Sequence, residues 1–158
     1  MKKGVITKGI GGFYYIDTET GVYECRARGI FRKEGIRPTV GDLVEISILD
    51  EMAKKGSLDV ILPRRNELIR PKVANVDQAM IVFAAKEPDP NPDLLDRFLL
   101  LVEEQKLDVV IVLNKIDRDE QKDYLALREI YQQAGYTVVS TCTYTGEGID
   151  ALREHMIG

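Results

Sequence analysis

A short polar segment directly after a strongly apolar run carries the residues best suited to chemistry. Asn114, Lys115 and Asp117 follow the apolar run Val109–Leu113. The carboxylate of Asp117 can accept two charge-assisted hydrogen bonds from adjacent N–H donors. Guanine presents such a pair, N1–H and the N2 amino group, whereas adenine lacks it and would leave the carboxylate unpaired. The Lys115 stem can lie along the face of the base, and the Asn114 amide can bond to the ring edge and to a neighbouring loop.

A second strand-like segment, Tyr136–Ser140, follows one strand-helix unit later and again ends in a polar residue. The carboxyl ends of parallel strands meet at one edge of a sheet, where ligands bind. We therefore expect the backbone N–H after Ser140 to face the guanine O6. Asn and Asp are also common in ordinary polar turns. The position between two strands favours guanine binding by Asn114, Lys115, Asp117 and Ser140.

Neither of the motifs that bind phosphates in GTPases accompanies this segment. The 158 residues contain no Gly-x-x-x-x-Gly-Lys-Ser/Thr, and no Asp is followed three residues later by Gly. Both motifs precede Asn-Lys-x-Asp in an ordinary GTPase. Either the match is accidental, or the order of the chain is rearranged and the catalytic half lies beyond Gly158.

The second half of the chain alternates strands with helices. An apolar strand ends at Ala84, and Asn91-Pro92-Asp93 then supplies an N-cap, a first-turn proline and an acidic group at the start of a helix. Its apolar stripe at helical spacing is Leu95, Phe98, Leu99 and Val102. A further helix is expected at about 120–134, ended by Gly135, and a last short one near the C-terminus. The order predicts a three-stranded parallel sheet with right-handed crossovers.

The first half is strand-like from residue 3 to about residue 69. Segments such as Val22–Arg28 and Gly41–Ile48 alternate apolar and polar residues, as half-buried strands do. Five short strands separated by glycine-rich turns fit a small closed barrel. The OB-fold is the common five-stranded form, and an SH3-like barrel is the alternative.

Charge is distributed unevenly between the halves. Residues 1–72 carry 14 Lys/Arg against 10 Asp/Glu, and residues 73–158 carry 8 against 16. The basic cluster of the first half consists of Arg26, Arg28, Arg32, Lys33 and Arg37. Basic residues near aromatic ones suit RNA, because the charges follow phosphates and the rings can stack on bases. A solvated rim around buried aromatic residues is the alternative.

The bulk composition, 44% hydrophobic and 30% charged, is that of a soluble globular protein. No apolar run approaches the ~20 residues that span a bilayer. Cys25, Cys142 and the single histidine, His155, stand in no metal-binding spacing, so we expect no structural zinc site among these residues. Two isolated cysteines favour a reducing compartment.

Several stretches together carry a family resemblance. They are Arg64–Pro71, Val73–Gln78, Leu94–Leu99, Val112–Asp117 and Gly146–Ile149. With them, the whole chain resembles the circularly permuted, small-subunit-dependent GTPases called the ribosome biogenesis GTPase A family. The resemblance implies an OB-fold RNA-binding domain at 1–69, a linker at 70–75, and at 76–158 the first, guanine-recognising part of a circularly permuted GTPase domain that stops before the P-loop.

The resemblance also implies an activity and partners. The implied activity is hydrolysis of GTP with the help of Mg²⁺. The implied role is in late maturation of the small ribosomal subunit in the cytoplasm. The implied partner is 16S ribosomal RNA, and no contact with DNA or membranes is expected. The catalytic residues, Mg²⁺ ligands and structural zinc of the family have no positions before Gly158. We therefore predict that this chain alone neither hydrolyses GTP nor binds it tightly, and that its half-sheet self-associates or is poorly ordered. A non-enzymatic OB-fold RNA-binding module with a vestigial nucleotide domain is the alternative.

Overall fold

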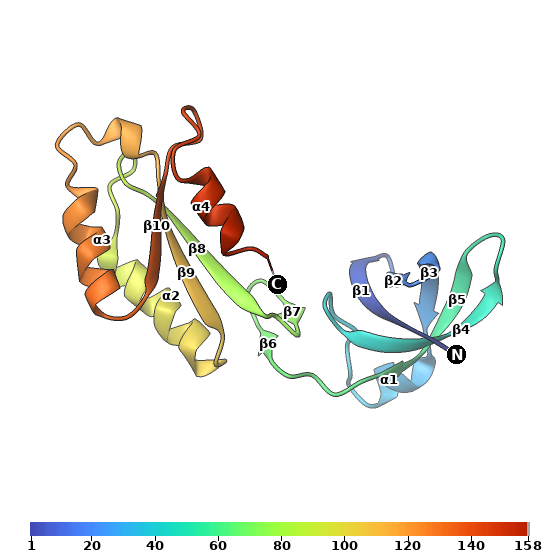
Figure 1. Ribbon diagram of the computed structural model, residues 1–158. Helices are drawn as coiled ribbons and strands as arrows, with labels where there is room; N and C mark the ends of the chain where they lie inside the picture. The colour runs from blue at the N-terminus through green and yellow to red at the C-terminus, as the bar shows by residue number, and fades with distance from the viewer. Residues whose placement is uncertain (158) are drawn as a thin grey trace. The chain divides into compact units, whose positions relative to one another are not determined.

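The structure, a computed structural model, describes residues 1–157 and contains two compact units (Figure 1). The first unit is Met1–Val76, and the second begins at Asp77. Each unit has its own hydrophobic core. No helix among the described residues is both long enough and apolar enough to cross a membrane.

A closed five-stranded barrel forms most of the first unit. Its strands are β1 (Lys2–Ile10), β2 (Phe13–Thr18), β3 (Gly21–Ala27), β4 (Leu43–Asp50) and β5 (Lys55–Ile61). They close in the order β1-β2-β3-β5-β4, with β3 and β5 parallel and the other pairs antiparallel. The helix α1 (Gly29–Lys33) lies between β3 and β4 in the chain. This arrangement confirms the expected OB-fold rather than the SH3-like alternative.

Alternate residues of the strands fill the barrel. Seven side chains in this core are fully buried: Ile6, Ile16, Tyr23, Cys25, Val44, Ile46 and Leu58. The helix α1 was not expected from the sequence, and its Phe31 packs against the barrel core. Five residues are too few to display a helical repeat in a sequence, so the local pattern does not reveal this helix.

The segment after β5 packs against a loop of the same unit. The short strands β6 (Glu67–Leu68) and β7 (Val73–Ala74) pair with each other. The amide of Ala74 donates to the Val40 carbonyl at 2.9 Å, and a Cβ at Gly41 would overlap the Ala74 carbonyl oxygen. Part of the segment expected to be a linker therefore lies against the barrel loop.

A bidentate ion pair fixes the start of this segment. The fully buried carboxylate of Asp42 accepts from Arg64 Nε at 2.6 Å and from Nη2 at 2.9 Å, and also from the Thr39 amide at 2.7 Å. The hydrogen bond to Asp42 raises the pKa of Arg64, so this guanidinium stays charged. Arg64 consequently has a structural role that its place in an arginine-rich stretch did not predict.

A three-stranded parallel sheet is the centre of the second unit. Its order is β10-β9-β8, formed by β8 (Gln78–Ala84), β9 (Asp108–Asn114) and β10 (Thr137–Thr141). The connecting helices are α2 (Pro92–Glu104), the 3₁₀ turn η1 (Ile116–Arg118), α3 (Tyr124–Gln133) and α4 (Ile149–Glu154). The predicted parallel strand-helix alternation is confirmed. Helix α3 begins later than expected, and the buried Asp119 accepts from the Tyr124 amide at 2.8 Å.

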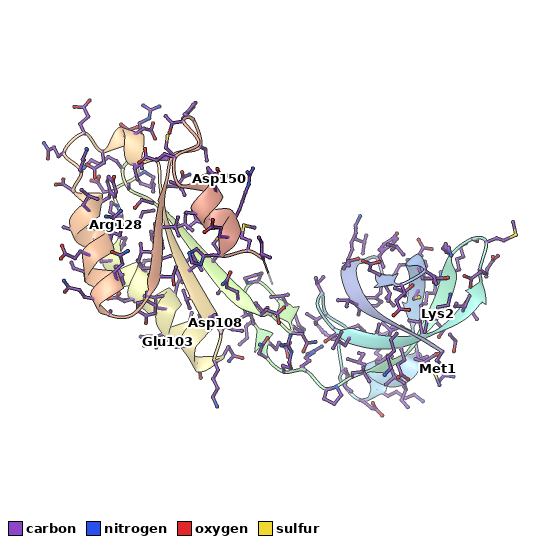
Figure 2. The ribbon with its side chains drawn as sticks, viewed as in Figure 1. Met1, Lys2, Glu103, Asp108, Arg128 and Asp150 are labelled. Atoms are coloured by element: carbon purple, nitrogen blue, oxygen red, sulfur yellow. The ribbon has the colours of Figure 1, made fainter. Side chains whose placement is uncertain are left out.

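Helices cover both faces of this sheet. Arg128 on α3 and Asp150 on α4 mark the two helical layers in Figure 2. Ile111 and Leu113 of β9 pack with α2 and α3, whereas its Val110 and Val112 pack in a cluster that includes α4. The expected burial of β9 on both faces is therefore confirmed. Phe98 differs from expectation, because 41% of it is exposed although its ring contacts that of Phe83.

Candidate guanine-binding site

Asn114 links the two strand ends at which the candidate site lies. It is the last residue of β9, and its register partner in β10 is Thr141. Its side-chain oxygen accepts from the Thr141 hydroxyl at 3.1 Å, and its backbone carbonyl accepts from the Ala85 amide at 2.6 Å. The asparagine therefore joins the loops after β8, β9 and β10.

Lys115 turns the chain sharply at this edge. Its backbone is left-handed, with φ 63° and ψ 38°, a conformation that non-glycine residues adopt mainly where the surroundings impose it and often at binding sites. Its ammonium donates to the Glu87 carbonyl at 2.7 Å, so the side chain extends toward the loop after β8. The turn leads into η1, which buries Ile116 and leaves Asp117 partly exposed.

Asp117 is both oriented and accessible. Its Oδ1 accepts from the Cys142 thiol at 3.2 Å, and its Oδ2 lies 3.6 Å from Arg118 Nε. The Asp117 side chain is 32% exposed, whereas Cys142 is 1% exposed. A buried donor from the loop after β10 thus orients a carboxylate whose other edge can be reached from solvent.

The loop after β10 is closed by its own backbone. The Cys142 amide donates to the Glu147 carbonyl at 3.0 Å, and the Gly146 amide donates to the Cys142 carbonyl at 2.9 Å. Gly148 has a positive φ of 73°, and a Cβ there would overlap the Ser140 carbonyl oxygen. Only glycine fits this position without a shift of the loop.

Two of the four predicted guanine-binding residues, Asn114 and Asp117, contact Thr141 and Cys142 at the end of β10, whereas Lys115 contacts the loop after β8. The fourth, Ser140, lies within β10, and its hydroxyl is buried without a hydrogen-bond partner among the described residues. Strand β10 runs one residue further than expected, to Thr141, and the contact to Asp117 comes from Cys142. From the sequence, Cys142 was only an isolated cysteine. The nearby Gly146 and Gly148, which allow the loop to close on Cys142 and Ser140, were the signal that could have drawn attention to it.

The first unit gathers part of the predicted basic cluster around a hollow of about 810 Å³. Arg28, Arg32 and Arg37 line it together with Lys72, and no Asp or Glu is among the lining residues. Lys72 was not expected in this cluster, because β4, β5 and β6 separate it from Arg37 in the chain. We call this cavity the basic hollow.

The other two residues of the predicted cluster do not line the basic hollow. The guanidinium of Arg26 lies over the Phe13 ring, 4.6 Å from its centre, on the paired strands β2 and β3. Lys33 is exposed at the end of α1. Because β3 ends at Ala27, the strand alternation expected to place Arg26 and Arg28 on one face stops between them.

Solved structures with the same arrangement exist. The structure described as YjeQ from Thermotoga maritima has a TM-score of 0.87 at 35% identity, covering 99% of this chain and 57% of that chain. The structure of YloQ, described as a circularly permuted GTPase, has a TM-score of 0.79 at 41% identity, covering 98% and 55%. Together, the fold and these similarities define an OB-fold barrel followed by part of a circularly permuted GTPase domain. Family models described as the RsgA N-terminal domain and RsgA GTPase match residues 3–56 and 61–158. The chain belongs to the RsgA GTPase family.

Curated relatives agree with this assignment. A protein of Alkaliphilus metalliredigens is 49% identical over 158 residues, covering 100% of this chain and 54% of the relative. One of Geobacillus thermodenitrificans is 45% identical, again covering 100% and 54%. Both are called small ribosomal subunit biogenesis GTPase RsgA. The chain spans about half the length of these relatives.

Proposed function

We propose that this chain supplies the guanine-recognising part and the RNA-binding barrel of a GTP-hydrolysing factor. The factor acts in the cytoplasm during late maturation of the small ribosomal subunit, with residues 1–69 contacting 16S ribosomal RNA and residues 76–158 contacting the nucleotide. The names of the relatives support the ribosomal assignment. The observation that carries the nucleotide assignment is the hydrogen bond from the Cys142 thiol to Asp117 at the carboxyl edge of the parallel sheet.

Asp117 recognises the base by accepting two hydrogen bonds. Its carboxylate accepts hydrogen bonds from N1–H and from the N2 amino group of guanine. The hydrogen bond from the Cys142 thiol holds the carboxylate in the orientation that presents its oxygens to these donors. Adenine places an acceptor at N1 and has no amino group at C2. The partly buried carboxylate would then lose its partners, which is an efficient way to reject a ligand.

The remaining contacts hold the base in its plane. The Lys115 stem lies along one face of the ring, and its ammonium stays anchored on the Glu87 carbonyl. Asn114 fixes the two loops to each other through Thr141. We assign the contact with guanine O6 to the amide of Thr143, which has no acceptor among the described residues, rather than to the amide after Ser140.

Phosphate binding requires groups that these 158 residues do not include. The sequence has no P-loop motif, and no cluster of carboxylate, cysteine or histidine side chains in residues 1–157 could hold a metal ion. The family implies GTP together with Mg²⁺, and most of the binding energy for such nucleotides comes from their phosphates. We therefore expect weak, base-specific binding by this chain and no phosphate release from GTP above background.

Variants of Cys142 test the nucleotide assignment. Cys142→Ser retains a donor to Asp117, whereas Cys142→Ala removes it. Guanosine and adenosine monophosphates are titrated at millimolar concentration and followed by NMR. The Cys142→Ser variant should keep the preference for guanine. The Cys142→Ala variant should reduce this preference roughly fivefold, the effect of losing a hydrogen bond of about 1 kcal/mol. Equal responses to both nucleotides in the unsubstituted chain would contradict the assignment.

Sedimentation with purified small ribosomal subunits tests the ribosomal assignment separately. The chain should co-sediment with small subunits at low salt and not with large subunits. Co-sedimentation without any base-specific nucleotide response would instead favour the non-enzymatic RNA-binding module. Failure to bind small subunits would contradict the proposed role of the barrel.

A further inference from the structure

We propose that the basic hollow of the barrel is a subsite for one unpaired nucleotide of single-stranded RNA. This inference rests on the proposed RNA contact of the barrel and adds to it the kind of ligand that the hollow accepts. The volume of about 810 Å³ lies in the range of roughly 300–1,000 Å³ typical of small-molecule sites. A nucleotide carries an anionic phosphate and a flat apolar base, and the hollow offers a partner for each.

The phosphate partners are arginine and lysine side chains on different segments. Arg28 and Arg32 come from the start and the body of α1, Arg37 from the loop after it, and Lys72 from the segment before β7. An arginine can bind a phosphate through two parallel hydrogen bonds. Arg28 Nε is 3.4 Å from an Asp59 oxygen, but the Arg28 side chain remains 63% exposed and can still reach a ligand.

The base partner is the ring of Tyr14. Phe31 also lines the hollow but is only 7% exposed, so it forms part of the floor. Tyr14 packs against the barrel core but is only partly buried, and it lines the hollow, so part of its side chain is accessible there. Bases stack on aromatic rings without a strong preference for sequence. Bases in an RNA duplex are already stacked and paired, so the hollow favours an unpaired nucleotide.

The wall of the hollow is held in place before RNA binds. The backbone carbonyl of Arg37 accepts from Arg64 Nη2 at 2.9 Å, and Arg64 is itself paired with the buried Asp42. The loop that carries Arg37 is therefore connected to the barrel through the ion pair of Arg64 with Asp42. A wall fixed in this way reduces the ordering cost of binding.

Gly29 offers a way to fill the hollow without disturbing the fold. It lines the hollow, its φ is not in the left-handed region, and a Cβ there would meet nothing within 4 Å. Gly29→Trp would therefore attach an indole at the hollow without a clash at its Cβ. The matched control is Ile30→Trp, because Ile30 is 52% exposed on the same helix and does not line the hollow.

The experiment measures binding of the full chain to a labelled eight-nucleotide oligouridine and to an RNA duplex of equal length. Gly29→Trp should weaken binding of the single strand roughly tenfold, as expected for losing one stacked base, and change duplex binding less than twofold. Tyr14→Leu should act in the same direction, Tyr14→Phe should retain binding, and Ile30→Trp should match the unsubstituted chain. Strong single-strand binding in both Gly29→Trp and Tyr14→Leu, or equal losses for both RNAs, would overturn the nucleotide subsite. Absence of binding to either RNA by the unsubstituted chain would overturn the RNA contact itself.

Discussion

Replacing Gly148 with alanine should disrupt the loop after β10 more than the same replacement at Gly146. Both glycines have positive φ angles, 73° and 80°, and both lie in the turn that closes the loop after β10. They differ in their surroundings. A Cβ at Gly146 would meet nothing within 4 Å, whereas one at Gly148 would overlap the Ser140 carbonyl oxygen and lie 3.0 Å from its carbonyl carbon.

The magnitude follows from two separate costs. An alanine held in the left-handed region costs about 1–2 kcal/mol, and this cost applies at both positions. The overlap at Gly148 adds the cost of moving backbone apart, about 1–3 kcal/mol, as for other overpacked sites. We therefore expect about 1–2 kcal/mol for Gly146→Ala and about 2–5 kcal/mol for Gly148→Ala.

Residue-resolved hydrogen exchange measures these costs locally. Exchange of the Val138 and Val139 amides reports the opening of β10, and each 1.4 kcal/mol corresponds to a tenfold change in protection. Gly148→Ala should accelerate exchange roughly 5-fold to 150-fold beyond Gly146→Ala, as the added cost of about 1–3 kcal/mol implies, and it should also weaken the response to guanosine monophosphate. Equal protection in the two variants would refute the argument that close approach to Ser140 shapes this loop.

Three further predictions concern the barrel. Arg64→Met should lower its free energy of unfolding in urea by about 3–5 kcal/mol, because the buried Asp42 carboxylate loses its partner; a change below 1 kcal/mol would show that the pair is not needed. The hydrogen bond from the Tyr23 hydroxyl holds the pKa of Glu51 at about 2, below its ordinary 4.5, so its contribution to stability should be present above about pH 4.5 and disappear as the pH falls toward 2. The melting temperature at low salt should therefore change less between pH 2 and pH 4.5 in Glu51→Gln than in the unsubstituted chain. The same pH dependence in both proteins would contradict this. RNA affinity should fall with salt at a log–log slope of roughly −3 to −5 if about five phosphates are neutralised, and Arg32→Glu should make the measured slope shallower.

Features set by neighbouring residues were predictable from the sequence. Asn91 caps α2 as expected, accepting from the Leu94 amide at 3.0 Å, because the capping bond joins residues three apart. The parallel sheet was predictable because apolar runs alternate with amphipathic segments. Asn114 and Asp117 could be selected as candidate guanine-binding residues because they directly follow the most apolar of these runs.

Features set by contacts between distant segments were not predictable. Whether Ser140 or Cys142 faces Asp117 depends on where β10 ends, and strand ends are poorly marked in a sequence. The association of Lys72 with the basic hollow depends on the path of the chain through β6 and β7. The position of Arg26 over the Phe13 ring depends on the pairing of β2 with β3.

The central claim is that Asp117 reads the base, and Asp117→Asn tests it most directly. Xanthine carries a carbonyl where guanine carries its N2 amino group, and the amide of an asparagine can donate to that carbonyl. The unsubstituted chain and Asp117→Asn are each titrated with guanosine and xanthosine monophosphates and followed by NMR. Each ligand carries a single phosphate, so the comparison reports mainly on the base. We predict that the unsubstituted chain prefers guanosine monophosphate and that Asp117→Asn prefers xanthosine monophosphate, with amide shifts concentrated in residues 114–118 and 141–146. An unchanged guanine preference in Asp117→Asn would contradict the claim.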